Sequence, residues 1–459
     1  MKRNKVSVVW KTAVTLAMAA LLVSVWPHAR SLYDLTGEEN LAAQLRGVGH
    51  WVNTAVRPQP SLATDAAIEN TAVSPFGVNT FLQQEVEPAK REQSLKLLHD
   101  AGFQFIRQEF PWEDIEIHGK GDFEDRRNLE AIGAVDAWAK YDQIVDLAES
   151  YDLQIIARIS NPPSWTRALT DTIGTYAPPD NFADFGDFAA AVAQRYQGRI
   201  HYYQIWNEPN GNQEWGLQDV DPEAYTELLC EGYRRIKEVD PDAVVLAAAL
   251  TPTLAMDGRH MNDLIFLQRM YNAGASECFD VASAQGYGLW SGATDQRLRS
   301  TVINYPHNLF IRDLMVRNGD AAKPIWISEM GWNSAPEEIP ANFGRVTEAQ
   351  QATYTVEAFQ RQQAEWPWVG VNSVWFFKRA GDSEMGESWY YFRMMEPDFT
   401  PLPVFPAVAE YATGDQTITP LPDWVRTWDG ARPLLFTLSS AILFFALLWS
   451  LAPKQAAGD

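Results

Sequence analysis

The chain of 459 residues is 46% hydrophobic and 12% aromatic, with 18 Trp, a balance typical of a globular protein with a sizeable core. Its net charge of -22 argues against nucleic acid or another anionic polymer as the main partner. The two cysteines, Cys230 and Cys278, stand without CxxC or His/Cys spacing, which argues against a structural zinc site. We predict two buried thiols, with a disulfide as the alternative in an exported chain.

The N-terminal residues form a basic start followed by an apolar run. Three basic residues among the first five precede a run that reaches Trp26 and is interrupted only by Lys11. Such a segment is either a secretory signal or an uncleaved membrane anchor. Because no small-residue cleavage site follows it, we predict a transmembrane anchor over residues 1–27, with the N-terminus in the cytoplasm.

A second apolar run lies near the other end of the chain. Residues 434–451 carry no charge, and their length is close to the ~20 residues that span a bilayer. We predict a second transmembrane helix over residues 433–452, followed by a short tail over 453–459. Residues 28–73 are then a linker or stalk, and residues 413–432 are a linker. Everything between the two spans is expected outside the cytoplasmic membrane.

Between residues 74 and 412, short apolar runs alternate with longer amphipathic segments. The runs predict eight strands, at residues 76–79, 103–108, 154–159, 202–206, 244–249, 281–285, 325–328 and 371–377. Helical patterns follow them, for example at residues 91–101, 142–150, 185–196, 224–239, 262–273 and 349–365. These units predict an α/β fold, a (β/α)8 TIM barrel, rather than an open doubly wound sheet. No Gly-rich nucleotide-binding turn follows the first strand, which favours the same conclusion.

Two glutamates stand at the carboxyl ends of predicted strands. The segment WNEP at residues 206–209 ends the fourth strand, and the segment ISEMGW at residues 327–332 ends the seventh. In a (β/α)8 barrel the catalytic groups lie at the carboxyl ends of strands, and the fourth and seventh strands face each other across the mouth. Glu208 and Glu329 can therefore converge on one sugar, as the paired carboxyl groups that cleave glycosidic bonds do.

These motifs resemble those of glycoside hydrolase clan A, in particular those of family 39 and of cellulase-like family 5 enzymes. The resemblance extends over about residues 75–411 and includes the segments 103–112, 161–165 and 397–401. It implies a retaining mechanism in which Glu208 is the general acid/base and Glu329 is the nucleophile. Retaining pairs of carboxyl groups lie about 5–5.5 Å apart, and inverting pairs about 6.5–9.5 Å.

The resemblance also implies roles for neighbouring residues. Arg107, at the tip of the second strand, is placed to hold Glu329 anionic, with a purely structural salt bridge as the alternative. Asn207 is expected to bind the sugar 2-hydroxyl, Tyr287 to donate a hydrogen bond to Glu329, and Trp375 to form the floor of the subsite. Many clan members have His-x-Tyr after the sixth strand, whereas this chain has Gln285 in the first of those positions. This departure concerns the glycone subsite and not the two glutamates.

Several other side chains have two interpretations. Trp165 and Trp332 either form floors of sugar subsites or fill the rim of the barrel. Glu109, Glu113 and Glu116 follow the second strand and predict a solvated loop face rather than catalytic groups. No Asp-x-Asp-x-Asp-Gly run is present, so we predict neither a bound metal nor a cofactor.

The sequence thus predicts a membrane-tethered, extracytoplasmic, retaining glycoside hydrolase that acts on a poly- or oligosaccharide. The expected partners are carbohydrate and, through the terminal helices, a membrane. Two alternatives remain open. One is a transglycosylase that remodels surface polysaccharide with the same two glutamates, and the other is a non-catalytic barrel that binds a glycan.

Overall fold

The computed structural model describes residues 14–16, 19, 41–56, 58–128, 130, 133–168, 176–295, 297–416, 438 and 441–446. The chain divides into two units, of which one contains residues 60–294 and 300–418. We call this part the barrel unit. The other unit contains residues 1–59, 295–299 and 419–459 and includes helix α3 (Leu41–Val56).

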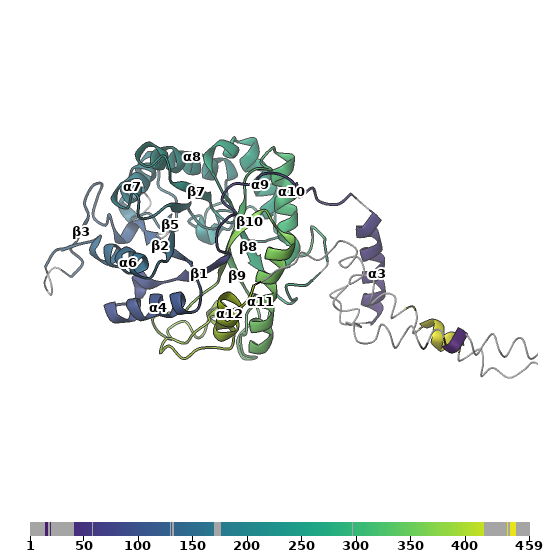
Figure 1. Cartoon of the computed structure of the whole chain (residues 1–459). Helices are drawn as coiled ribbons and strands as arrows, with labels where there is room; N and C mark the ends of the chain where they lie inside the picture. The colour runs from purple at the N-terminus through teal and green to yellow at the C-terminus, as the bar shows by residue number, and fades with distance from the viewer. Residues whose placement is uncertain are drawn as a thin grey trace, which may run out of the picture. The chain divides into compact units, whose positions relative to one another are not determined.

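A single parallel sheet of eight strands forms the centre of the barrel unit (Figure 1). The strands are β1 (Phe76–Thr80), β2 (Phe105–Pro111), β5 (Gln154–Ser160), β6 (Tyr202–Ile205), β7 (Val244–Ala247), β8 (Ala282–Tyr287), β9 (Ile325–Gly331) and β10 (Val369–Val374). Their order is β7-β6-β5-β2-β1-β10-β9-β8, and a parallel bridge between Leu246 and Val281 joins the two edge strands. The predicted (β/α)8 barrel and its eight strands are therefore confirmed.

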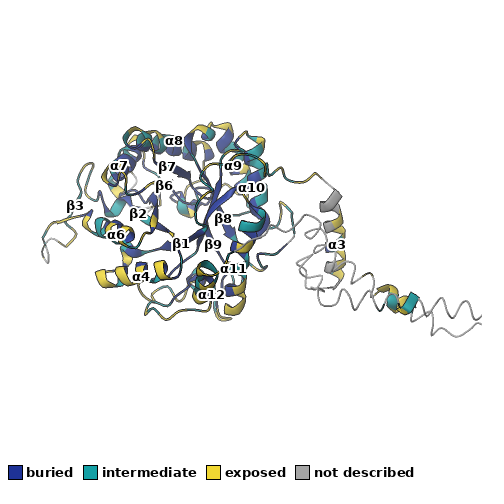
Figure 2. Cartoon of the chain, viewed as in Figure 1, coloured by how far each residue is buried: buried dark blue, intermediate teal, exposed yellow. Residues whose placement is uncertain are grey.

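Helices surround the sheet in the order that the sequence pattern predicts. They are α4 (Pro88–Asp100), α6 (Ala139–Ser150), α7 (Phe182–Arg195), α8 (Pro222–Val239), α9 (Asp263–Asn272), α10 (Asn308–Arg317), α11 (Glu348–Glu365) and α12 (Val404–Thr413). Local signals fix several helix starts: Asp221 caps α8, and Thr347 forms a capping box with Gln350 at the start of α11. Figure 2 shows the strands as buried and the outer face of α4 as exposed, the pattern of an amphipathic outer layer.

A short hairpin interrupts the long connection after β2. Its strands β3 (Glu124–Asp125) and β4 (Val135–Asp136) have two residues each and pair antiparallel. Strands of this length carry no periodicity, so the sequence pattern could not predict them.

The inside of the barrel is apolar at the amino ends of the strands and polar toward their carboxyl ends. A compact cluster of six buried side chains fills the amino end: Phe105, Ile156, Leu246, Val281, Trp326 and Val371. Side chains alternate along a strand, so the inward residue two positions after Phe105 is Arg107, and the next is Glu109. The apolar layer closes the floor, and the polar residues are left at the carboxyl end, where a cavity opens.

The barrel unit begins earlier than the predicted start at residue 74. Arg312 is fully buried and donates a hydrogen bond to the carbonyl oxygen of Leu62 (3.0 Å). The indole Nε1 of Trp326 donates to the carbonyl oxygen of Asn70 (2.9 Å). Residues 60–73 therefore pack across the amino end of the barrel, and part of the segment predicted as linker or stalk belongs to the folded unit.

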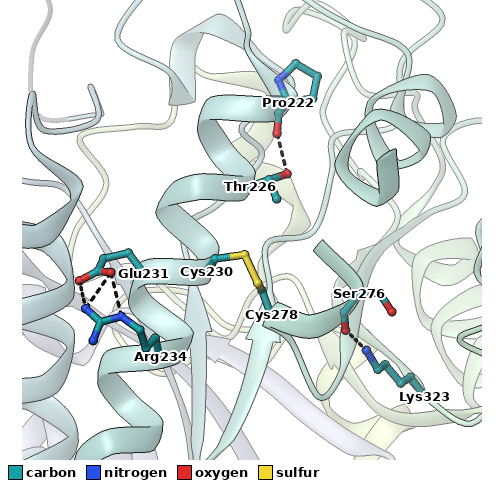
Figure 3. The surroundings of a disulfide bond; sticks show 8 residues. All are labelled: Pro222, Thr226, Cys230, Glu231, Arg234, Ser276, Cys278 and Lys323. Carbon is teal, nitrogen blue, oxygen red and sulfur yellow. Dashed lines mark hydrogen bonds and ion pairs between the residues drawn. A yellow bond between two sulfur atoms is a disulfide. The ribbon is translucent and has the colours of Figure 1, made fainter. Parts of the chain in front are cut away.

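Cys230 and Cys278 form a disulfide, so the prediction of two buried thiols is wrong. Cys230 lies on α8 and Cys278 ends the short helix η6 (Ala275–Cys278), with a distance of 4.7 Å between their Cα atoms (Figure 3). The bond links residues 48 positions apart in the sequence. Only the packing of η6 against α8 brings them together, and no spacing rule contains that contact.

The two predicted transmembrane segments, residues 1–27 and 433–452, lie mostly outside the described residues. Within the described ranges, no helix has the length and apolar character needed to cross a membrane. Most of the predicted linker at residues 413–432 also lies outside the described residues.

Candidate active site

A cavity of about 820 Å³ opens at the carboxyl ends of the strands. Five of the predicted site residues line it: Asn207, Glu208, Tyr287, Glu329 and Trp375. The wall also contains side chains that the sequence did not single out as site residues, namely Phe81, Glu109, Arg158, Tyr176, Glu214, His260, Phe343, Arg379, Glu384, Trp389 and Phe392. Because these residues come from the carboxyl ends of many different strands and from the loops that follow them, the cavity has the position expected of an active site in a (β/α)8 barrel.

Glu208 reaches the cavity through an unusual backbone turn after β6. Trp206 and Glu208 have φ values of 74° and 40°, in or near the left-handed region that residues other than glycine rarely occupy. The backbone N–H of Glu208 donates to the carbonyl oxygen of Ala249 (3.0 Å), which ties the turn to the segment after β7. Backbone strain of this kind is typical of functional sites and persists only where the surroundings hold it in place.

Glu329 reaches the cavity through a bulge in β9. In the pairing with β8, Ala284 is opposite Ile327, whereas the next residue, Gln285, is opposite Glu329. Ser328 is therefore the extra residue of the bulge, which changes the alternation of side chains. Without it, Glu329 would share the outward face of Ile325 and Ile327, away from the cavity.

Arg107 connects four strands through its guanidinium group. Its Nη1 donates to Oε1 of Glu329 (2.8 Å) and to Oδ1 of Asn79 (2.8 Å). Its Nη2 donates to Oδ1 of Asn207 (2.9 Å), and its Nε donates to Oε1 of Gln204 (2.6 Å). Arg107 is 3% exposed and Glu329 is 4% exposed, so this ion pair is little screened by water. The predicted contact between Arg107 and Glu329 is present.

Strand β8 supplies one hydrogen-bond donor to each glutamate. Tyr287 Oη donates to Oε2 of Glu329 (2.7 Å), and Gln285 Nε2 donates to Oε1 of Glu208 (2.6 Å). These two donors are two positions apart on one face of one strand, a spacing of roughly 6–7 Å. The two carboxyl groups are therefore held side by side over one short stretch of the cavity. The sequence identified Gln285 only as a departure from the clan pattern and gave no signal for its contact with Glu208.

The two glutamates have different electrostatic surroundings. Burial and the nearby charge of Glu329 raise the pKa of Glu208 well above its usual range. Burial and the nearby charges of Glu329 and Glu208 raise the pKa of Tyr287. Its hydroxyl therefore stays protonated and donates a hydrogen bond to Glu329. Glu329 thus has a charged donor and a phenol, which complement a negative charge, whereas Glu208 has an uncharged amide. The two glutamates therefore have the unlike environments that a general acid and a nucleophile need.

Further acidic residues near the cavity differ from prediction. Glu109 lines the cavity and forms an ion pair with Arg158 of β5, and Glu116 is 5% exposed, so the predicted solvated loop face is wrong for both. Glu214, which had no role in the prediction, accepts a hydrogen bond from Nδ2 of Asn207 (3.2 Å). Burial raises the pKa of Glu214 to about 7.

Of the three tryptophans considered as floors of sugar subsites, one lines the cavity and two do not. Trp375 follows β10 and packs edge-on against Phe81, with ring centroids 5.4 Å apart. Trp165 packs against Trp112 and donates its Nε1 to the carbonyl oxygen of Glu116. Trp332 is fully buried, and its Nε1 donates to the carbonyl oxygen of Ser291. The interpretation of Trp165 and Trp332 as substrate-binding floors of sugar subsites is therefore wrong, because neither lines the cavity and the Nε1 of each donates to a backbone carbonyl oxygen.

No group of three or more His, Cys, Asp or Glu side chains among the described residues has an arrangement that could hold a metal ion. The acidic groups that line the cavity are instead paired with arginine, amide or hydroxyl donors, as Glu329, Glu208 and Glu109 are.

Comparison with known proteins gives one family and many structures of the same fold. The family model of cellulases, glycosyl hydrolase family 5, matches residues 65–338. No curated protein matches the chain. A family 39 glycoside hydrolase from the gut symbiont Bacteroides cellulosilyticus WH2 is similar, with a TM-score of 0.53 and 18% identity over 75% of this chain and 64% of that one.

Two further structures are similar to about the same degree. The GH5_18 protein from Streptomyces cattleya in complex with GlcNAc has a TM-score of 0.54 and 16% identity, over 77% of this chain and 83% of that one. The β-glycosidase BGL167 has a TM-score of 0.53 and 15% identity, over 76% of this chain and 98% of that one. Identities this low show a common barrel fold, and the family assignment depends on the family model. Since that model spans more than half of the sequence, the chain belongs to the cellulase family of glycoside hydrolases, glycosyl hydrolase family 5.

Proposed function

We propose that this glycoside hydrolase cleaves O-glycosidic bonds of a poly- or oligosaccharide by double displacement, with Glu208 as the general acid/base and Glu329 as the nucleophile. One observation carries the assignment. The two glutamates face the same cavity, and donors two residues apart on β8 hold them. Retaining glycosidases need two carboxyl groups at such close range.

In the first step, a carboxylate oxygen of Glu329 attacks the anomeric carbon and forms a covalent glycosyl ester. The bond from that carbon to the leaving oxygen breaks, and Glu208 gives its proton to this oxygen. The raised pKa of Glu208 supplies an acid at neutral pH. The hydrogen bonds from Arg107 and Tyr287 hold the carboxylate of Glu329 in place before the attack.

In the second step, Glu208 is ionised and accepts a proton from water, whose oxygen attacks the anomeric carbon. The ester bond to Glu329 breaks, and its carboxylate returns to the hydrogen bonds of Arg107 and Tyr287. Loss of negative charge from Glu329 in the intermediate lowers the pKa of Glu208, because a like charge nearby has been removed. One residue can therefore act as acid first and as base afterwards.

Asn207 and Trp375 are proposed to contact the sugar. Asn207 lines the cavity next to Glu208 and is placed to bind the 2-hydroxyl, a contact that can strengthen in the transition state. Trp375 is half-buried in the cavity wall, and its ring offers an apolar face to the C–H face of a pyranose.

Isosteric replacement tests the two glutamates. We expect Glu208→Gln and Glu329→Gln each to lose at least about 100-fold in kcat against the best aryl glycoside or polysaccharide substrate. Full activity in both variants would refute the assignment. Tight glycan binding by the unaltered enzyme without turnover would favour the non-catalytic barrel, and products longer than the substrate would favour transglycosylation.

We further propose that the barrel unit works outside the cytoplasm while tethered to a membrane by the apolar segments at residues 1–27 and 433–452. The disulfide between Cys230 and Cys278 supports export, because disulfides persist mainly in oxidising compartments. At the amino end of the barrel, the entering chain binds Arg312, and Thr413 at the end of α12 lies beside Gly102. Both ends of the barrel unit therefore lie at the amino end of the barrel, opposite the mouth of the cavity.

Membrane extraction tests the tether. We expect the full chain to stay with the membrane fraction after washing with alkaline carbonate and to be released by detergent. Release by carbonate or high salt alone would contradict a transmembrane anchor.

A further inference from the structure

We propose that Glu214 is a third carboxyl group of the active site, which positions Asn207 for a substrate that carries a free 2-hydroxyl. This inference rests on the proposed function, since it needs Asn207 to contact the sugar. Glu214 acts through Asn207 and is therefore a positioning residue.

The orientation of the Asn207 amide is fixed by two partners. The guanidinium of Arg107 only donates, so the atom of Asn207 that faces it at 2.9 Å must be the carbonyl oxygen Oδ1. The amide nitrogen Nδ2 then faces Glu214 and donates to its Oε1 (3.2 Å). The second hydrogen of Nδ2 forms no hydrogen bond with any described residue. Asn207 also lines the cavity. That hydrogen is the group available to a sugar hydroxyl.

Removal of Glu214 would leave the amide held on one side only. The hydrogen bond from Arg107 fixes Oδ1, but rotation of the Asn207 side chain about that contact moves Nδ2. The acceptor at Glu214 stops this rotation. Positioning within a fraction of an ångström decides how well a transition-state contact forms.

The backbone holds Glu214 in this place. Glu214 ends the short helix η5 (Asn212–Glu214), six residues after Glu208. The indole Nε1 of Trp206 donates to the carbonyl oxygen of Glu214 (2.8 Å), and the Trp206 ring is 1% exposed. The strained turn that carries Asn207 and Glu208 therefore also carries Trp206, which holds the backbone of Glu214 in place. The side chains of Asn207, Glu208 and Glu214 are thus positioned by one turn.

The charges around Glu214 come from three strands of the barrel. Arg158 on β5 favours its ionised form, whereas Glu109 on β2 and Glu329 on β9 oppose it. No described basic side chain forms an ion pair with Glu214, although its surroundings are buried enough to raise its pKa to about 7. Ionisable side chains whose pKa is strongly shifted by their surroundings are concentrated at functional sites.

The test compares a 4-nitrophenyl glycoside of the preferred sugar with its 2-deoxy analogue, each corrected for spontaneous hydrolysis. We expect Glu214→Ala to lower kcat/KM about 10-fold to 100-fold for the 2-hydroxy substrate, the range of one lost hydrogen bond to a charged group. The loss on the 2-deoxy substrate is expected to be less than about 2-fold, because the contact that Glu214 supports is already absent. Equal losses on both substrates would overturn the proposal.

Glu214→Gln keeps an oxygen that can accept from Asn207 and is expected to recover most of the activity lost in Glu214→Ala. If Glu214→Gln were as impaired as Glu214→Ala on the 2-hydroxy substrate, the positioning role would be refuted. Glu384→Gln is the matched control, since Glu384 lines the same cavity but contacts Arg379 rather than Asn207. Its effect, whatever its size, is expected to be the same on both substrates.

Failure of this inference differs from failure of the proposed function. If Glu208→Gln or Glu329→Gln were fully active, the catalytic assignment itself would fall. If both were inactive while Glu214→Ala affected the two substrates equally, only the role of Glu214 would fall.

Discussion

At the scale of single residues, the site depends on how differently two glutamates are surrounded. Glu329 accepts from a guanidinium and a phenol, and Glu208 accepts from the amide of Gln285. The sequence placed both glutamates at the mouth of the barrel and gave Arg107 and Tyr287 as neighbours of Glu329. It could not give Gln285 or Glu214 as partners, because neither contact follows from a motif or a spacing.

The acid role of Glu208 predicts a dependence on the leaving group. Glu208→Gln should lose about 100-fold to 10,000-fold in kcat/KM on a substrate with an alkoxide leaving group, which needs a proton. On a 2,4-dinitrophenyl glycoside the same variant should lose less than about 10-fold in kcat/KM, because that leaving group departs without protonation. Steady-state kinetics on the two substrates measure the difference. An equal loss on both would assign Glu208 a role other than proton donation.

The raised pKa of Glu208 predicts the alkaline limb of the pH profile. Activity needs the protonated carboxyl in the first step, so kcat/KM should fall as the pH rises through the raised pKa of Glu208. In Glu208→Gln this limb should be absent from the residual activity on the dinitrophenyl glycoside. Persistence of the same limb in the variant would assign it to another group.

The same shift predicts an effect on stability. The folded state holds a proton on Glu208 at pH values where the unfolded chain has lost it, so stability falls as pH rises from the unfolded pKa to the raised folded value. Glu208→Gln removes this loss and should unfold at a higher temperature than the parent at pH 8, by about 2–4 °C for each kcal/mol. At pH 4 the two proteins should be close. Calorimetry at both pH values measures this, and a lower melting temperature at pH 8 would contradict it.

At the scale of secondary-structure elements, the bulge in β9 decides which side chains reach the cavity. Alternation alone predicts Trp326 and Ser328 inside and Glu329 outside, yet Glu329 accepts from Arg107 inside the barrel. The sequence pattern predicted the strand because it is a continuous apolar run, and it placed the glutamate at the mouth because the residue stands at the carboxyl end of that run. The bulge itself had no local signal, since it depends on pairing with β8.

The disulfide gives a prediction for α8 and η6. Closing a loop of 48 residues stabilises the folded state by about 4 kcal/mol in the chain-entropy model. In chemical denaturation, the double variant Cys230→Ser, Cys278→Ser should therefore have a free energy of unfolding lower by about 4 kcal/mol. Treatment of the parent with a reductant under denaturing conditions should lower its stability to a similar value. A double variant as stable as the oxidised parent would contradict a stabilising bond.

At the scale of the whole molecule, the barrel was predictable and several of its long-range contacts were not. Eight apolar runs separated by amphipathic segments were sufficient to predict the fold, because strands of a parallel barrel are buried on both faces. Trp332 and Trp375 have similar positions after their strands, yet one packs in the core and the other lines the cavity. Three-dimensional packing separates them, and it likewise brings Cys230 to Cys278.

The extent of the barrel unit predicts where the chain can be cut. A fragment of residues 60–416 keeps the backbone acceptors of Arg312 and Trp326 and should be monodisperse in buffer without detergent, with the kcat/KM of the full chain on small aryl glycosides. A fragment that starts at residue 74 loses the carbonyl oxygens of Leu62 and Asn70, the partners of Arg312 Nε and Trp326 Nε1, so its melting temperature should be lower. Equal melting temperatures of the two fragments would contradict the structural role of residues 60–73.

Trapping the covalent intermediate identifies the nucleophile directly. An activated 2-deoxy-2-fluoro glycoside of the preferred sugar slows both steps, but its good leaving group lets the first step proceed, so the glycosyl ester accumulates. Mass spectrometry of the inactivated enzyme should show one added fluoroglycosyl group, and peptide mapping should place it on Glu329. A label on any other residue, or full activity with no label after prolonged incubation, would contradict the role of Glu329 as the nucleophile.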